Sequence, residues 1–307
     1  MSRQHRLAIA LLLFAMVAMT TNDVVIKLLS DSYPLHQMVF VRSAVGLSVG
    51  LVFLYFEGGL SLLRTEQTGL HVLRATAIVL ANMIFFAAIA VLPLGLATGI
   101  FFVSPLFITL LSVPLLGARV GPRRLVAVGL GLLGVAIIVS GDVALPVGTA
   151  PWVLILPIAA AFLYALTNVL SSKLGQRSRA SAMSLYIQTA FLSVALVFYF
   201  AAGDGRFAVG QTNGSITFLL RAWTWPAPQD VWLFGVMGVL GGVIGYVFSQ
   251  AYRLGQPATL APFEYVALPL AMMWGALVFN EDLGLRLWIG SALIVGSGLY
   301  VFWRERQ

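Results

Sequence analysis

Residues 7–28 read LAIALLLFAMVAMTTNDVVIKL, an apolar run whose few polar residues gather toward its end. A helix needs about 20 mostly apolar residues to cross a bilayer, so this stretch is long enough for one crossing. The whole chain of 307 residues has the same character, with 60% hydrophobic and 9% charged residues and a mean hydropathy of +0.96. A soluble domain carries about 25% charged residues. The composition therefore argues against a soluble enzyme, a disordered tail and a nucleic-acid module.

Further stretches of this kind follow along the chain and predict an all-α polytopic membrane protein with ten transmembrane helices. Pro93, Pro122, Pro151 and Pro257 stand where spans begin or connections turn, which suits a residue tolerated in the first helical turn. The expected spans are 7–28, 34–56, 69–91, 94–115, 123–141, 151–171, 181–202, 230–251, 257–279 and 285–303.

The distribution of Lys and Arg predicts the orientation of these spans. Ten spans place both termini on one side, and 13 of the 18 basic residues, Arg74 among them, fall in the loops and ends assigned to that side. By the positive-inside rule that side is cytoplasmic. The long, turn-rich connection at about 203–229 is then extracytoplasmic, and it holds either a short amphipathic helix near Ile216–Trp225 or an ordinary ordered loop.

An internal repeat divides the chain into units 1–147 and 148–307. The pattern T-N-x4-K occurs at Thr21–Lys27 and again at Thr167–Lys173, 146 residues later, and the same offset sets Gln188 against Arg42. Because five spans is an odd number, the second unit enters the membrane the other way up. Two inverted five-helix repeats are a common architecture of secondary transporters, in which one site opens to either side in turn.

Several local stretches of the sequence resemble the drug/metabolite transporter superfamily, of the EamA type with two five-helix repeats. These stretches are Val39–Arg42, Ser104–Leu106, Ala261–Tyr265 and Phe279–Gly284. The resemblance implies transport of small organic solutes across the bacterial inner (plasma) membrane, with amino acid exporters and carriers of S-adenosylmethionine or riboflavin among the members. The stretch Pro262–Tyr265 is reminiscent of the cofactor-type carriers. The first repeat departs from the pattern, since 116–119 lacks an acidic residue corresponding to Glu281.

Four ionisable residues lie well inside the expected spans, namely Asp23, Lys27, Arg42 and Glu264. Such residues are costly in a bilayer and usually face a bundle interior or a wet cavity. Glu264 suits proton coupling or contact with a substrate amine; the alternative is a structural glutamate that locks two helices together.

Arg42 could bind a substrate carboxylate or phosphate, or it could pair with Asp23. Lys27 is one helical turn beyond Asp23, so an Asp23–Lys27 pair is equally open. Gln188 could offer amide hydrogen bonds at the matching place in the second repeat.

Amide and aromatic residues of the spans are candidates for the cavity wall. An unpaired amide in hydrocarbon is costly, which favours a role for the amides, whereas most of the aromatic residues have plain packing as the commoner alternative. The candidates are Asn22, Asn82, Phe85, Phe101, Tyr164, Asn168, Tyr186, Tyr246, Gln250, Tyr265 and Trp274. Glycines in spans 123–141 and 285–303 predict close helix packing rather than binding.

These observations together predict a secondary active transporter that moves a small polar or amphipathic metabolite, an amino acid or related solute, by alternating access. Proton coupling is one option. A carrier of a larger cofactor-type solute such as S-adenosylmethionine or riboflavin is the alternative, and a channel or uniporter is the alternative of another class. We expect no enzymatic activity, cofactor, metal or nucleic acid. The expected partners are the substrate, the lipid bilayer and protons, for a monomer or homodimer.

Overall fold

The computed structural model describes residues 3–117, 122–139, 150–174, 178–255, 260 and 263–305. Most of these residues form helices. The helices are α1 (Arg3–Leu29), α2 (Leu35–Glu57), α3 (Thr68–Ile89), α4 (Leu94–Phe101), α5 (Ser104–Leu116), α6 (Pro122–Val139), α7 (Ile155–Leu174), α8 (Ala180–Ala202), α9 (Gly214–Leu220), α10 (Val231–Leu254), α12 (Ala267–Phe279) and α13 (Leu285–Glu305).

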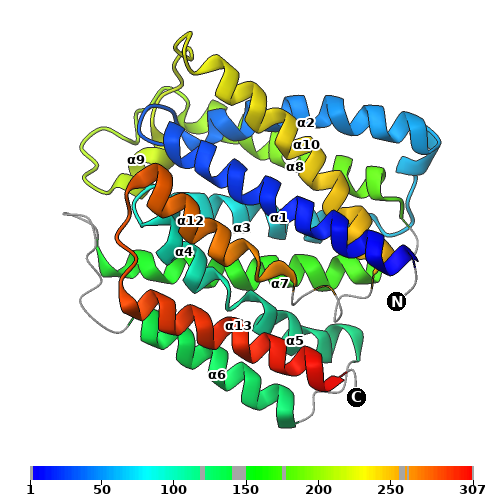
Figure 1. The fold of residues 1–307 in the computed structure, drawn as a ribbon. Helices are drawn as coiled ribbons and strands as arrows, with labels where there is room; N and C mark the ends of the chain where they lie inside the picture. Colours follow the sequence, from blue (N-terminus) through cyan, green and yellow to red (C-terminus); the bar gives the residue numbers. More distant parts are fainter. Residues whose placement is uncertain are drawn as a thin grey trace.

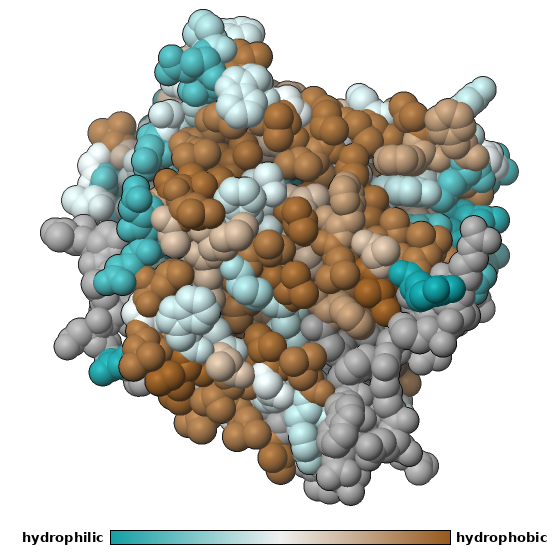
Figure 2. Space-filling view, in the orientation of Figure 1, coloured by the Kyte–Doolittle hydropathy of each residue, from teal (hydrophilic) through white to brown (hydrophobic). Residues whose placement is uncertain are grey.

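Seven helices in the described part are long and apolar enough to cross a membrane, and three shorter apolar helices accompany them. Their outward faces carry large apolar side chains such as Val52, Phe200 and Leu277, which are exposed. Hydrophobic residues cover most of the face in Figure 2, with hydrophilic ones gathered mainly toward its left and right margins. Soluble monomers rarely expose apolar surface on this scale. The chain is a multi-pass helical membrane protein.

The helices form one bundle whose two chain termini lie at the same end (Figure 1). We refer to this end as the terminus-side end and to the other, where α9 lies, as the far end. Helices α1, α2, α8 and α10 pack together, α3 packs along α7, and α13 packs along α6. Helices α4 and α12 contact each other.

The expected span at 94–115 is interrupted rather than continuous. Helix α4 ends at Phe101 and α5 begins at Ser104, with Pro105 in its first turn, where a missing N–H does no harm. A comparable interruption precedes α12, because Tyr265 and Val266 form a turn before the helix begins at Ala267. The expected span 94–115 is thus confirmed as a candidate membrane crossing, Leu94–Leu116, which is made of two helices. Most of the first turn of span 257–279 lies outside the described residues.

The long connection 203–229 contains a short helix, α9, which begins earlier than expected. Asn213 sets its start, because its side-chain Oδ1 accepts a hydrogen bond from the Ile216 amide at 3.2 Å. Trp223 and Trp225 follow the helix instead of belonging to it. Trp223 stacks on His36 of α2 with ring centroids 5.9 Å apart, whereas Trp225 is 97% exposed. Only Trp225 is free to act as an interfacial anchor.

Glycines bring the backbones of α6 and α13 into contact. A Cβ atom added to Gly134 would lie 2.7 Å from the Gly290 carbonyl oxygen, and one added to Gly290 would lie 2.5 Å from the Gly134 oxygen. Small residues allow this close approach in lipid, where dispersion contacts between helices replace the hydrophobic effect. The α6–α13 pair therefore packs tightly, as the glycine pattern predicts.

A G290L substitution is expected to destabilise the protein by about 1–3 kcal/mol, the usual cost of overpacking a close contact. Its added side chain would collide with the Gly134 carbonyl and with Ile138. Thermal unfolding in detergent measures the change. The matched control is G129A, because a Cβ atom at Gly129 meets no atom within 4 Å. Equal melting temperatures for the two variants would contradict the tight contact.

Candidate functional site

A cavity of about 150 Å³ lies inside the bundle, where the two halves of the chain meet. A water molecule needs about 10–15 Å³ of such space, so the cavity can hold a group much larger than water. Residues of α1, α2, α3, α4, α7, α8, α10 and α12 line it. Helices α6 and α13 contribute none of these lining residues.

An acidic and a basic residue both line the cavity. Asp23 of α1 is 8% exposed and Arg42 of α2 is 6% exposed; both line the cavity, and the described residues show no ion pair or hydrogen bond between them. The Arg42 guanidinium lies over the rings of Phe86 and Phe191, 5.7 and 4.6 Å from their centroids. Cation–π contact of this kind stabilises a desolvated guanidinium. Two candidates from the sequence, Asp23 and Arg42, are thus brought together in the cavity.

The two positions matched by the internal repeat, Arg42 and Gln188, flank the same glycine of α10. Gln188 donates a hydrogen bond from Nε2 to the Gly241 carbonyl at 2.9 Å, and a Cβ atom at Gly241 would lie 2.7 Å from Arg42 Cγ. The Gln188 Oε1 atom and the Asn22 Oδ1 atom are buried with no hydrogen-bond partner among the described residues. Because buried polar atoms are normally paired, these two oxygens are available to a ligand.

Arg74 of α3 also lines the cavity, nearer the terminus-side end. It is 3% exposed and donates hydrogen bonds from Nε to Ser171 Oγ at 2.6 Å and from Nη1 to the Met183 carbonyl at 3.3 Å. Counting Arg74 among the loop and end charges was therefore wrong, because a full helical turn of α3 precedes it. Its position inside the predicted span was the signal that could have shown this.

Glu264 is buried behind the cavity wall rather than in it. Its carboxylate accepts hydrogen bonds from the Tyr252 hydroxyl and, at 3.4 Å, from the Tyr164 hydroxyl. Tyr164 lines the cavity, so it stands between Glu264 and the enclosed space. The arrangement connects α7, α10 and the turn before α12, and among the described residues Tyr164 links Glu264 to the cavity.

The remaining candidates divide by position. Five of them, Asn82, Phe85, Phe101, Tyr164 and Asn168, line the cavity together with Asn22, Asp23, Arg42 and Gln188. Tyr265, Tyr246, Gln250 and Trp274 do not. Tyr265 packs against the ring of Phe102, and Tyr246 donates to Glu57. Gln250 accepts a hydrogen bond from Arg253 at the end of α10.

Sequence reasoning missed several lining residues besides Arg74. They are apolar or weakly polar side chains that do not stand out in an apolar chain, such as Phe86, Phe191, Phe248, Thr98, Thr167, Ser171 and Ser249.

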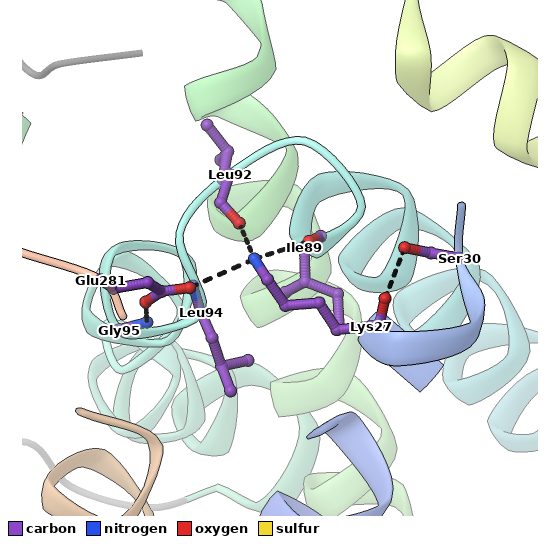
Figure 3. A network of polar contacts seen from close by, with 7 residues as sticks. All are labelled: Lys27, Ser30, Ile89, Leu92, Leu94, Gly95 and Glu281. Atoms are coloured by element: carbon purple, nitrogen blue, oxygen red, sulfur yellow. Dashed lines mark hydrogen bonds and ion pairs between the residues drawn. The ribbon is translucent and has the colours of Figure 1, made fainter. Parts of the chain in front are cut away.

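The far end of the bundle is held by a polar network centred on Lys27 and Glu281 (Figure 3). Lys27 Nζ lies 3.3 Å from Glu281 Oε1 and donates to the carbonyls of Ile89 and Leu92 at 3.1 and 2.6 Å. Glu281 also accepts the first amides of α4, from Leu94 at 2.6 Å and Gly95 at 3.1 Å. The expected alternative of an Asp23–Lys27 pair is not formed, because Lys27 reaches across to the other half of the chain.

A second network joins the helices at the terminus-side end. Glu57, the last residue of α2, accepts hydrogen bonds from the Ser181 hydroxyl at 2.6 Å and the Tyr246 hydroxyl at 3.0 Å. Tyr186 of α8 donates to the Leu63 carbonyl. Polar contacts therefore join helices of the two halves at both ends of the bundle.

A multi-pass helical membrane protein with an internal cavity that carries a few charged and amide side chains has an architecture that suits a transporter of small solutes. The comparisons agree with this class. The model of the EamA-like transporter family matches residues 6–140. This match and the named relatives support the drug/metabolite transporter superfamily.

Relatives match the chain over most of its length. The riboflavin transporter of Vibrio cholerae is 28% identical over 276 residues, which cover 87% of this chain and 83% of the relative. The S-adenosylmethionine uptake transporter of Rickettsia prowazekii is 22% identical and covers 96% of this chain and 92% of the relative. A solved crystal structure with 18% identity shares the fold, with a TM-score of 0.65 over 99% of this chain and 96% of that chain.

Proposed function

We propose that the chain is a secondary carrier of a cofactor-type solute, of the riboflavin or S-adenosylmethionine kind, and that this solute binds in the central cavity. The observation that supports this most directly is the wall itself, which combines aromatic faces with the Asp23–Arg42 pair and unpaired amide oxygens. Aromatic faces stack on a planar ring, and the polar groups suit a polyol or an amino-acid end. The relatives' names favour this solute class over a free amino acid.

Alternating access between two inverted five-helix units, 1–147 and 148–307, is the mechanism we infer. Each helix of the first unit can be paired in order with one of the second: α1 with α7, α2 with α8, α3 with α10, α4 with α12 and α6 with α13. When the members of each pair are exchanged, these helix contacts map onto one another. The α1–α10 contact corresponds to α3–α7, and α2–α10 corresponds to α3–α8. The α6–α13, α2–α8 and α4–α12 contacts correspond to themselves. This correspondence supports ten spans related by an axis in the membrane plane.

We propose that the chain lies in the inner membrane of a bacterium, with its terminus-side end facing the cytoplasm. The positive-inside rule supports this placement. With Arg74 removed from the count of 13, 12 basic residues still fall on the terminus side, against the five assigned elsewhere. A periplasm-sensitive reporter fused after Gln307 should stay inactive, and an active one would reverse the orientation.

Uptake into proteoliposomes tests the proposed function. Purified full-length protein should give saturable uptake of labelled riboflavin or S-adenosylmethionine, and unlabelled solute inside the vesicles should accelerate entry by counterflow. A pore shows no counterflow, so its absence together with rapid flux would favour the channel alternative. Absence of any flux of either solute would contradict the proposed substrate class.

Glu264 is proposed to couple transport to protons through Tyr164. An E264Q variant cannot ionise, yet its amide oxygen can still accept one tyrosine hydrogen bond, so it is expected to fold and to lose the pH dependence of uptake. Initial uptake rates over a pH series spanning neutrality measure this. The matched control is E66Q, which removes a carboxylate at an exposed loop position. If uptake by E264Q had the same pH dependence as uptake by the wild-type protein, Glu264 would have a structural role and not a coupling role.

A further inference from the structure

Arg74 is an ionised side chain whose hydrogen bonds leave most of its donors unused. Within the described residues, its contacts to Ser171 and Met183 occupy Nε and Nη1. A guanidinium has five N–H donors in a planar fork, so further donors remain for another acceptor. Because the residue lines the cavity and is 3% exposed, a group in the cavity is the acceptor within its reach.

The described cavity wall has more basic than acidic residues, which leaves Arg74 without an acidic partner. The described lining residues include one acidic residue, Asp23, and two basic residues, Arg42 and Arg74. No carboxylate among the described residues forms an ion pair with Arg74. A cation within a membrane protein is costly unless oxygen acceptors surround it. The wall supplies two such oxygens, and a bound ligand can supply the others.

Arg74 and Arg42 lie at different depths in the bundle. Helix α2 begins at the far end with Leu35, and Arg42 comes seven residues after it. Helix α3 ends at the far end with Ile89, and Arg74 comes fifteen residues before it. At 1.5 Å per residue the two positions are separated by about 12 Å along the bundle. Phe101, Tyr164 and other aromatic side chains contribute to the same wall. The cavity wall thus carries two separate arginine positions, Arg42 and Arg74, with aromatic side chains in the same wall.

We propose that Arg74 forms a second ligand subsite, separate from the Asp23–Arg42 pair, which binds the acceptor-rich edge of a planar ring. A guanidinium fork donates two parallel hydrogen bonds and so matches neighbouring carbonyl oxygens and ring nitrogens. The pyrimidine-dione edge of a flavin ring has this pattern. An adenine edge sets an amino donor beside its acceptor and matches less well. The subsite rests on the proposed function, and within it selects flavin-type over adenosine-type solutes.

Binding of lumiflavin, the flavin ring without its polyol chain, tests this subsite directly. Quenching of lumiflavin fluorescence by the purified full-length protein in detergent gives the affinity. An R74K variant keeps the charge but loses the fork, and its lumiflavin affinity is expected to fall about 10- to 100-fold. The R179Q control removes an exposed arginine at the start of α8 and is expected to bind as the wild type does.

A purely structural role of Arg74, holding α3 to α7 and α8, predicts a different outcome. The S171A variant removes one of these connections and leaves the guanidinium in place. The subsite predicts that S171A retains lumiflavin binding while R74K loses it at an unchanged melting temperature. Equal losses in both variants, or a loss in R74K that only follows a lowered melting temperature, would overturn the subsite.

The failure of the subsite and the failure of the proposed function give different results. If proteoliposomes take up riboflavin but R74K binds lumiflavin like the wild type, the subsite is wrong and the carrier function stands. If uptake is absent but lumiflavin binds in an Arg74-dependent way, the subsite stands and the proposed function fails. If the wild-type protein does not bind lumiflavin at all, the ring-edge subsite is overturned whatever the uptake shows.

Discussion

An R42Q variant is expected to lose transport and to unfold more readily than the wild-type protein by about 3–5 kcal/mol. The substitution removes the positive charge of Arg42, which with Asp23 belongs to the buried charged groups of the cavity wall. It also removes the contacts with the rings of Phe86 and Phe191. Thermal unfolding in detergent and solute uptake in proteoliposomes measure the two effects separately.

The double variant D23N/R42Q separates stability from function at this pair. Replacing both partners of a buried pair by neutral groups of similar shape is often close to neutral for stability. The double variant is therefore expected to regain the melting temperature while transport stays lost. Transport at the wild-type rate would show that the pair is only structural. R206Q, at an exposed arginine beside Asp204, is the matched control for removing one positive charge.

An E281A variant is expected to have an effect of similar size, about 3–5 kcal/mol, because it leaves the poorly exposed Lys27 ammonium without its carboxylate. It also leaves two α4 amides without their acceptor. We expect the far end to open more often as well. The chain contains no cysteine, so a single cysteine at Thr98, which lines the cavity on α4, should react faster with a thiol reagent in this background.

The neighbouring acid provides the control for this prediction. Asp282 is exposed, and a D282N variant should leave both the melting temperature and the labelling rate unchanged. An E281A protein that is destabilised but labelled at the wild-type rate would mean that the network stabilises the fold without holding the far end closed.

Within the described residues, seven of the expected spans correspond to helices long and apolar enough to cross a membrane, and these were predictable because hydropathy is a local property of the chain. The interruption at Phe102 and Val103 was missed, since it depends on where Pro105 begins a new helix rather than on hydropathy. Partners that are distant in sequence were also missed. Helical periodicity relates Lys27 to Asp23, whereas Glu281 reaches Lys27 only through the packing of the two halves.

Part of the candidate site was predictable because some of its residues stand out within the local sequence. Asp23, Arg42 and Gln188 stand out because charges and amides are costly in an apolar span, and the structure sets all three in the cavity wall. Phe86 and Phe191 could not be distinguished from ordinary lipid-facing residues. Arg74 was misplaced because a rule based on counting charges near span ends does not consider which way a side chain points.

The interruption between α4 and α5 separates the two ends of one membrane crossing. A continuous helix tilts as a rod, so a displacement at one surface is transmitted to the other. Here α4 is attached to Glu281 at the far end, while α5 packs against α7. In the alternating access that we propose, release of α4 would therefore widen one entrance without disturbing the opposite one, and this independence would keep the carrier from leaking.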